Sequence, residues 1–313
     1  MLNRRNFFTA TAASATAATL LSNDTAEADS SRPFPVTFAL NTSTLRGQQL
    51  SVPEQIDVAA DAGYDGIEPW IRDVRGFVEG GGKVSDLKKQ LDDRKLKVVS
   101  AIGFANWIVD DDKARAAGLD EARRDMQLVR ELGGNHIAAP PIGAHQPGLP
   151  QPSLPVIAQR YRALCEVGDE MAVYPQLELW GFSPTLHTLG ELAYVSTAAA
   201  HAKACVLPDF YHIYKGGNDF ESLGMIEASK MHCFHINDYP AEPGLDTIAD
   251  KDRVFPGDGV CDLPNIIQRL VNNGFQGVFS LELFNPEYWK RDALEVATEG
   301  LNKSKAVVLK AIS

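Results

Sequence analysis

The chain has 313 residues, of which 44% are hydrophobic and 23% are charged, and these values are typical of a globular protein with one large α/β domain or two small ones. The formal net charge of −11 at pH 7 disfavours a nucleic-acid partner, because phosphate contacts need clustered Lys and Arg. No apolar run approaches the ~20 residues that span a bilayer, and the four cysteines lack the CxxC spacing of a zinc knuckle.

The first 28 residues have the composition of an export signal rather than of a folded segment. Arg4 and Arg5 precede two phenylalanines and a weakly apolar Ala/Thr stretch, and the triplet 26–28 (AEA) offers a small-x-small cleavage site. This order of features resembles a twin-arginine signal, whose pathway exports folded proteins. We therefore expect residues 1–28 to be removed, residues 29–313 to form one domain, and the mature protein to be periplasmic or otherwise exported, without stable membrane insertion. The alternative is a disordered tail on a cytosolic protein.

After residue 35, short apolar runs alternate with longer amphipathic ones, which is the pattern of βα units around a parallel sheet. The predicted strands are 36–40, 65–70, 97–103, 136–140, 174–180, 204–210, 231–236 and 277–283. Helix-like stretches include 54–63, 84–95, 119–134 and 263–274, and several of them end at a glycine, as helices often do. Eight such strands with roughly eight helices predict an α/β fold, the (β/α)8 TIM barrel.

Four polar residues stand at the carboxyl ends of the later predicted strands, where a barrel of this kind carries its chemistry. They are Glu178, Asp209, His235 and Glu282, each among hydrophobic neighbours. One such residue alone would be read as a structural hydrogen-bonding group. Three carboxylates at one barrel mouth, however, would repel one another unless a cation lay between them. Oxygen ligands with one imidazole suit Mn²⁺, Mg²⁺ or Co²⁺, so we expect one divalent metal ion, with Mn²⁺ preferred.

In order and spacing, these motifs resemble the xylose-isomerase-like barrel family, which includes ketose 3-epimerases, inosose dehydratase, hydroxypyruvate isomerase and endonuclease IV. The resemblance covers essentially the whole chain after the signal. The segments that carry it are GYDGIEP with Glu68, LELW with Glu178, PDFYH with Asp209 and His212, FHINDY with His235, RVFPGDG with Arg253 and LELF with Glu282.

The resemblance implies a sugar isomerase or epimerase that transfers a proton next to a carbonyl through an enediolate. It makes Glu178, Asp209, His235 and Glu282 the ligands of one divalent ion. Glu178 and Glu282 would also be the catalytic acid and base, because strands five and eight of an eight-stranded ring can flank a substrate from opposite sides.

Further residues are expected to contact the substrate, a small carbohydrate. His212 and Arg253 would bind its oxygens, since a guanidinium offers a rigid fork of donors. Glu68, at the end of strand two, is a third candidate. Trp180, Trp107 and Trp70 also follow strands and would stack on an apolar sugar face, with core packing as the alternative reading of such aromatic residues.

The chain departs from the family pattern at three places. Pro184 stands where several ketose epimerases carry a further glutamate, so substrate contacts on that side must differ. The 236–252 segment is longer than in compact epimerases and would either shape the pocket or form a solvated acidic loop. The Pro-rich 139–155 segment is expected to be a stiff lid or pocket wall, with His145 as a surface residue, and His136 is read as structural.

Three alternative functions share parts of this site. Endonuclease IV needs a cluster of metal-binding His residues in the first half of the barrel, and strands one to three contain no His. A dehydratase or lyase would share the first proton removal and differ in the fate of the enediolate. A non-catalytic exported sugar-binding protein would not need two flanking carboxylates. The identity of the sugar and the oligomeric state stay open, and no Gly-rich phosphate cradle is present.

Overall fold

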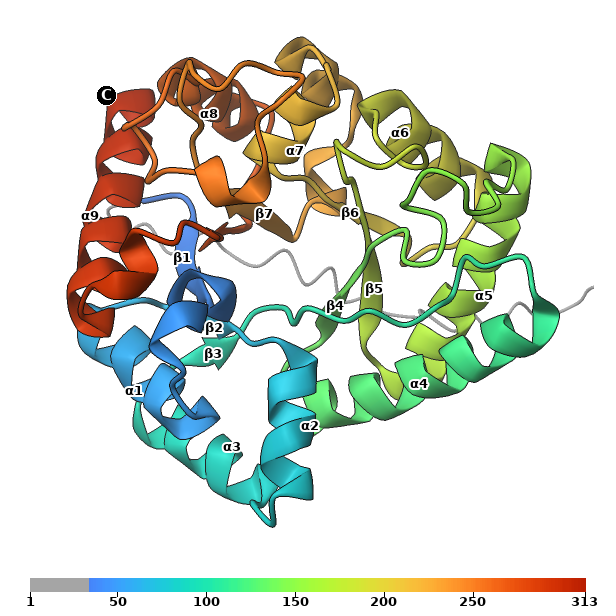
Figure 1. Cartoon of the computed structure of the whole chain (residues 1–313), viewed down its shortest axis with the longest axis horizontal. Coiled ribbons are helices and arrows are strands. Elements are labelled where there is room, and N and C mark those ends of the chain that lie inside the picture. The colour runs from blue at the N-terminus through green and yellow to red at the C-terminus, as the bar shows by residue number, and fades with distance from the viewer. Residues whose placement is uncertain (1–33) are drawn as a thin grey trace, which may run out of the picture. The chain divides into compact units, whose positions relative to one another are not determined.

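Eight parallel strands form a TIM barrel inside a ring of helices (Figure 1). The structure is a computed structural model that describes residues 34–313, so the predicted export signal lies outside the described residues. The strands are β1 (Thr37–Asn41), β2 (Gly66–Glu68), β3 (Lys97–Val98), β4 (His136–Ala139), β5 (Tyr174–Glu178), β6 (Cys205–Leu207), β7 (Cys233–Ile236) and β8 (Val278–Leu281).

The strands pair in two groups, in the orders β3-β2-β1-β8-β7 and β4-β5-β6. Two seams join these groups into a closed ring. Beside β6 and β7, isolated parallel bridges connect Val206 with Met231 and Asp209 with His235. Between β3 and β4, the backbone N–H of Ala138 donates to the carbonyl of Ala101 at 2.8 Å. The closed ring therefore brings the carboxyl ends of all eight strands to one mouth.

Each strand is followed by at least one helix. The helices are α1 (Val52–Ala62), α2 (Ile71–Glu79), α3 (Val84–Asp93), α4 (Asp112–Glu131), α5 (Leu154–Met171), α6 (Leu189–Ala198), α7 (Phe210–Lys215), α8 (Leu263–Asn272) and α9 (Ala293–Ile312). Short 3-10 helices are η1 (Thr42–Gln48), η2 (Phe220–Met225), η3 (Ala228–Lys230), η4 (Asp250–Asp252) and η5 (Tyr288–Lys290). The last helix, α9, packs between α8 and α1 and so completes the outer ring (Figure 1).

Local sequence explains where these helices begin and end. At the start of α1, Ser51 and Glu54 form a capping box, and Gly63 ends the helix with φ of 88°, a conformation that favours glycine. In α8 the buried residues, Leu263, Ile266, Ile267 and Leu270, recur every three or four positions and face the barrel wall. None of the helices within residues 34–313 has both the length and the apolar character required to cross a membrane.

All eight predicted strands contain an observed strand, but several predicted ends were too long, two of them by three residues or more. Of the predicted strand 97–103, only β3 is observed, because beyond Val98 only an isolated bridge between Trp70 and Ile102 continues the pairing. The 204–210 prediction runs into α7, whose N-cap is Asp209: its carboxylate accepts the backbone N–H of His212 at 2.8 Å. The PDFYH segment therefore turns from strand to helix at the aspartate.

The main core lies between the strands and the helices, and a small second cluster fills the barrel below its mouth. That cluster consists of Trp70, Ile102, Ala138, Leu207 and Cys233. Its residues come from five different strands or strand ends and pack under the polar mouth. Residues Phe34–Ser313 form one compact unit.

Candidate metal centre and active site

The polar residues predicted at the strand ends meet at the mouth of the barrel. Glu178 is the last residue of β5, Asp209 follows β6, His235 lies in β7 and Glu282 follows β8. All of them are buried, with His235 fully inaccessible and Glu178 only 4% exposed. The structure therefore brings together the four residues that the sequence predicted as metal ligands.

One ring nitrogen of His235 is the point on which the carboxylates converge. Nδ1 lies 3.2 Å from Glu282 Oε2, 3.6 Å from Asp209 Oδ2 and 3.9 Å from Glu178 Oε1. Neither this nitrogen nor Glu178 Oε2 has a hydrogen-bond partner, although both atoms are buried. Buried polar atoms are nearly always satisfied, so this pair of unsatisfied atoms is available to bind a ligand.

The protonation of these residues also fits a cation site. Burial raises the pKa of Glu178 to about 8, and the nearby charges of Glu282 and Asp209 add to the rise against the opposing effect of His235. Although burial opposes it, the carboxylates of Glu282 and Glu68 hold the pKa of His235 well above its ordinary value. Protons thus balance the clustered negative charge, and a divalent cation would replace them. One imidazole and three carboxylates are a donor set for a divalent metal ion.

Arg253 is the second cation of the site and is almost fully buried. Its Nη1 donates to Asp209 Oδ2 at 3.0 Å and to Glu282 Oε2 at 2.9 Å. Its Nη2 lies 3.0 Å from His212 Nε2 and donates to Asp250 Oδ1 at 2.5 Å. A guanidinium can only donate, so His212 accepts at Nε2 and carries its proton on Nδ1. Burial and Arg253 lower the pKa of His212, which keeps this imidazole neutral.

Glu68 lies behind the metal centre rather than in front of it. Its Oε2 is 3.0 Å from His235 Nε2 and accepts hydrogen bonds from Ser280 Oγ at 2.7 Å and Asn41 Nδ2 at 2.9 Å. The glutamate is fully buried, and its placement does not support the predicted contact with substrate. It fixes the tautomer and the orientation of the imidazole, so that Nδ1 faces the carboxylates.

Asn41 was missed by sequence reasoning. Its Nδ2 donates to Glu68 and, at 3.1 Å, to Glu282 Oε1, so one amide links the two glutamates. The signal was available: Asn41 is the last residue of β1 and follows four largely apolar residues, as the other strand-end polar residues do. The rule was applied to the second half of the barrel and not to the first strand.

Three tryptophans are predicted to contact substrate; Trp70 is buried and stacks against Arg46, and the other two have different positions. Trp107 is buried in the core, where its Nε1 donates to the Pro140 carbonyl at 2.9 Å and its ring packs on Tyr161. This placement favours the alternative of core packing. Trp180 is half-buried beside the site, with its ring centroid 5.2 Å from Phe182 and 6.4 Å from His212. Its prediction as a substrate contact therefore stays open.

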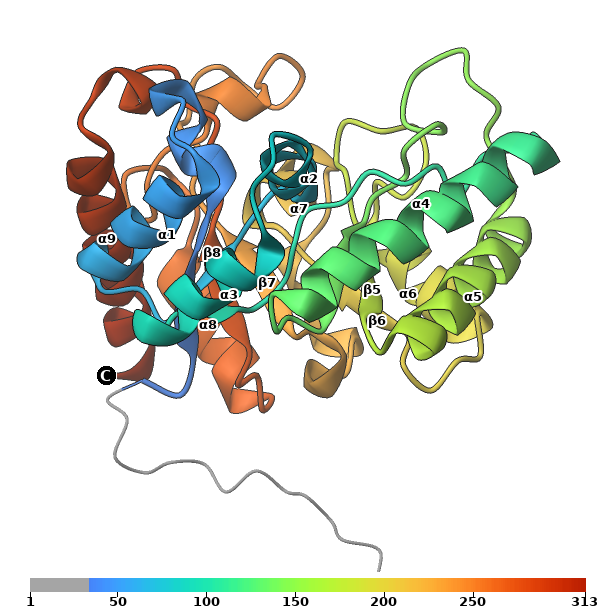
Figure 2. The same cartoon turned by 90° about the horizontal axis from the view of Figure 1, so that it is seen from below.

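Two long segments, 139–155 and 236–252, extend from the same end of the barrel (Figure 2). Within the Pro-rich 139–155 segment, His145 is half-buried and packs edge-on against Trp180, so only part of its side chain lies at the predicted surface. The 236–252 segment contacts the site through Asp250, which accepts from Arg253. This contact favours the alternative in which the segment shapes the pocket, which stays a prediction.

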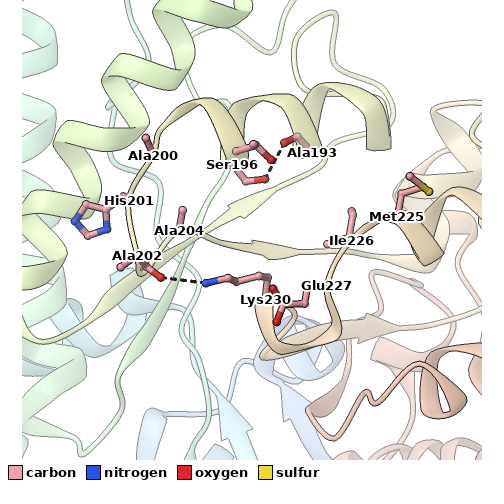
Figure 3. Close-up of a pocket in the computed structure, with 11 residues that line it drawn as sticks. Ala193, Ser196, Ala200, His201, Ala202, Ala204, Met225, Ile226, Glu227 and Lys230 are labelled. Atoms are coloured by element: carbon pink, nitrogen blue, oxygen red, sulfur yellow. Dashed lines mark hydrogen bonds between the residues drawn. The ribbon is translucent and has the colours of Figure 1, made fainter. Parts of the chain in front are cut away.

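Two other features lie at the opposite, amino-terminal end of the strands. The imidazoles of His136 and His232 lie near Cys205, with their ring centroids 4.2 Å apart and their planes tilted. Burial raises the pKa of the Cys205 thiol to about 12, and Lys203 adds positive charge. This cluster therefore suits a cation poorly. A hollow of about 510 Å³ lies between α6 and the segments before β6 and β7 (Figure 3). It contains none of the residues at the mouth.

The chain belongs to the xylose isomerase-like TIM barrel family, whose model matches residues 56–305. Among curated relatives, it is 26% identical to an inosose isomerase of Bacillus velezensis over 86% of this chain and 95% of that protein. It is 24% identical to a 3-dehydroshikimate dehydratase of Pseudomonas aeruginosa, over 80% of this chain but only 39% of that longer protein. A crystal structure of an IolI protein with a bound zinc atom has the same fold, with a TM-score of 0.81 at 22% identity, over 89% of this chain and all of that one.

Proposed function

We propose that the protein is a divalent-metal-dependent isomerase or epimerase of small keto-sugars that moves a proton next to the carbonyl carbon. The observation that carries this proposal is that carboxylate oxygens of Glu178 and Glu282 both lie close to His235 Nδ1, at 3.9 and 3.2 Å. Two carboxylates at one point can remove a proton and return one. The inosose isomerase and fructoselysine 3-epimerase relatives support this reaction class.

The ion that we propose is Mn²⁺, with Mg²⁺ and Co²⁺ as alternatives, held by Glu178, Asp209, His235 and Glu282. When bound, it would act as a Lewis acid toward a carbonyl oxygen and an adjacent hydroxyl oxygen of the sugar. The donor set of oxygens and one imidazole nitrogen, together with the zinc in the IolI neighbour, supports a divalent ion.

The surroundings of the two glutamates suggest which of them takes the proton. Glu178 Oε2 is buried and has no hydrogen-bond partner, so it is free to accept a proton from the substrate carbon. Both oxygens of Glu282 already accept hydrogen bonds, Oε1 from Asn41 and Oε2 from Arg253. We therefore assign removal of the proton to Glu178, and delivery of a proton that Glu282 takes up from solvent to the other face of the carbon; Glu178 then releases its proton to solvent.

Neighbouring side chains would hold the substrate oxygens during this transfer. Arg253 carries a fixed positive charge beside the reacting carbon, where it would stabilise the enediolate. The Nδ1–H of His212 has no partner within the described residues and is available to donate to a hydroxyl group. Trp180 and its aromatic neighbours would exclude water from this side.

The test uses Glu178→Gln and Glu282→Gln at saturating Mn²⁺, because glutamine keeps the shape and one oxygen ligand while removing basicity. Each variant should lose turnover by about 10²–10⁴-fold. Glu178→Gln should also stop exchange of the substrate proton with deuterium from solvent, whereas Glu282→Gln should retain exchange without forming product. Glu131→Gln, at an exposed position on α4, is the matched control. Near-normal turnover in both metal-loaded active-site variants would show that the two-carboxylate mechanism is wrong.

A dehydratase or lyase is the second candidate, supported by the 3-dehydroshikimate dehydratase relatives. Such an enzyme needs only one glutamate as base, so Glu282→Gln would lower metal affinity and leave the proton removal nearly intact. Loss of water from the substrate would accompany exchange. A non-catalytic sugar-binding protein would catalyse no exchange at all.

We also propose that residues 1–28 direct export through the twin-arginine pathway to the periplasm. The paired arginines, the Ala/Thr run and the small-x-small triplet support this assignment. The double variant Arg4→Lys, Arg5→Lys should leave the protein in the cytoplasm. Unchanged export of that variant would refute the assignment of residues 1–28 as a twin-arginine signal.

A further inference from the structure

A second pocket, of about 440 Å³, lies between η1, the start of α1 and α2. Its position is at the catalytic end of the barrel, because η1 follows β1 and Trp70 follows β2. The side chains that matter here are Ser43, Arg46, Gln55 and Trp70. None of them has a role in the proton transfer proposed above.

Arg46 is the distinctive residue of this pocket. Its guanidinium carbon lies 3.8 Å from the ring centroid of Trp70 and 5.2 Å from that of Phe284. Stacking of this kind holds the planar cation in one orientation. Its Nη2 is buried and has no hydrogen-bond partner among the described residues. A buried, charged N–H group without an acceptor is costly, so an acceptor from a bound ligand is the expected partner.

The charge of the pocket indicates which acceptor this is. The guanidinium carbon of Arg72 lies 4.4 Å from the same Trp70 ring, and burial together with Arg72 lowers the pKa of Arg46. Asp73, 3.3 Å from Arg72 Nε, is the one carboxylate in the described lining. The lining holds two cations and one anion, and Glu282, outside the lining, also acts on the charge of Arg46. The pocket therefore carries at most a single positive charge, which matches a carboxylate better than a doubly charged phosphate.

Two further buried atoms describe the rest of the ligand. Ser43 is 1% exposed and Gln55 is 6% exposed, and neither Ser43 Oγ nor Gln55 Oε1 has a hydrogen-bond partner within residues 34–313. The serine hydroxyl can donate or accept, and the amide oxygen of Gln55 can only accept. These groups are suited to hydroxyl groups on the molecule whose carboxylate Arg46 binds.

One hydrogen-bonded chain connects the pocket with the metal centre. Trp70 Nε1 donates to Asn41 Oδ1 at 3.1 Å, and Asn41 Nδ2 donates to Glu282 Oε1 at 3.1 Å. The ring that carries Arg46 is thus one residue away from a proposed catalytic carboxylate. A ligand in this pocket would lie beside the reacting groups.

We propose that this pocket binds the carboxylate of a hydroxylated acid through Arg46, and that the substrate is a keto-sugar acid rather than a neutral keto-sugar. The binding of the acid follows from the pocket alone. Its identification as the substrate rests on the function proposed above. Arg46 is then the residue that selects for charge.

The experiment measures binding of two probes, D-gluconate and D-sorbitol, to the metal-loaded full chain by calorimetry. The probes have the same six-carbon polyol chain and differ in the carboxylate. Arg46→Met keeps the stacking on Trp70 and removes the charge, so it should weaken gluconate binding by about tenfold or more and leave sorbitol unaffected. Arg46→Lys should recover part of the loss. Arg130→Met, at an exposed position on α4, is the control and should bind as the wild type does.

The proposal would be overturned if the wild type bound gluconate and sorbitol equally, or if it bound neither probe. Gluconate binding that Arg46→Met leaves unchanged would overturn it as well. Proton exchange of keto acids and neutral keto-sugars separates this failure from that of the proposed function. Exchange of both classes at similar rates would retain the isomerase and refute the selection for acids. Arg46-dependent gluconate binding without exchange of any substrate would retain the pocket and refute the isomerase.

Discussion

Replacing Glu68 by glutamine tests whether this buried carboxylate positions the proposed metal ligand His235. The change preserves shape: glutamine can keep its carbonyl oxygen where Glu68 Oε2 now accepts from Asn41, Ser280 and His235. Its amide group would then lie where Oε1 is now, near Cys233 Sγ at 3.9 Å. What is lost is the negative charge beside His235 Nε2, and with it the basicity that Nδ1 offers to a cation.

The expected loss of metal affinity is about 10–100-fold, as is usual for groups that hold a ligating imidazole, or about 1.4–2.8 kcal/mol. Full Coulomb attraction at 3.0 Å would be about 5–6 kcal/mol at an effective dielectric constant near 20, and this is an upper limit. Glu68→Ala is a poorer probe, because it would leave buried donors unpaired at about 1–3 kcal/mol each and so threaten folding.

The assay is a Mn²⁺ titration of the chelator-treated protein by calorimetry, with the unfolding temperature of the metal-free form as a check on folding. Ser280→Ala, which removes one neutral donor to the same oxygen, is the control and should change the metal Kd much less. An unchanged metal Kd with a raised KM for Glu68→Gln would refute this reasoning. That result would restore Glu68 as a substrate contact.

Three further outcomes are expected. The wild type should bind about one divalent ion per chain, and elemental analysis that finds three ions per chain would contradict the single-metal site. Asp209→Asn should weaken metal binding strongly, because it removes a charge without changing the shape of the side chain. Metal binding near pH 7 should release protons and strengthen as the pH rises through 8, because the pKa of Glu178 is raised to about 8 and that of His235 is raised as well. Equal apparent binding enthalpies in buffers of different ionisation enthalpy would contradict this release of protons. Burial raises the pKa of Asp125 from 3.8 to about 6, so the stability that its protonated form contributes is complete below pH 4 and lost as the pH rises through 6. The free energy of unfolding of Asp125→Asn relative to the wild type should therefore rise by up to about 3 kcal/mol between pH 4 and pH 8 in denaturant titrations, and a difference that does not change with pH would refute it.

Sequence alone was sufficient to predict the fold and the meeting of the four proposed metal ligands at one mouth, for a physical reason. Parallel strands of a barrel end at one mouth, so a lone Glu, Asp or His after an apolar run is placed by chain topology near the others. Glu178, Asp209, His235 and Glu282 meet this condition, and a single rule recovers them. The alternation of apolar and amphipathic runs fixed the number of strands in the same way.

Only the tertiary structure shows which of the polar residues lie beside His235 Nδ1 and which lie behind its ring. Glu68 and Glu282 both follow apolar strands, yet Glu68 lies behind the His235 ring and Glu282 beside its other nitrogen. A strand-end position determines the level of a residue along the barrel axis. It does not determine where the end of its side chain points, because that depends on partners far away in the chain. Asn41, which contacts both glutamates, is 27 residues from one and 241 from the other.

The same limit explains why Arg46 and Trp107 were not placed by sequence. Arg46 lies in a 3-10 helix whose pattern indicates nothing about the Trp70 ring on which it stacks. Trp107 follows a strand, as a substrate contact would, but its indole N–H is bound by the Pro140 carbonyl from the next βα unit. Local pattern determines which elements form and where they end, whereas the packing of those elements determines which side chains face the substrate.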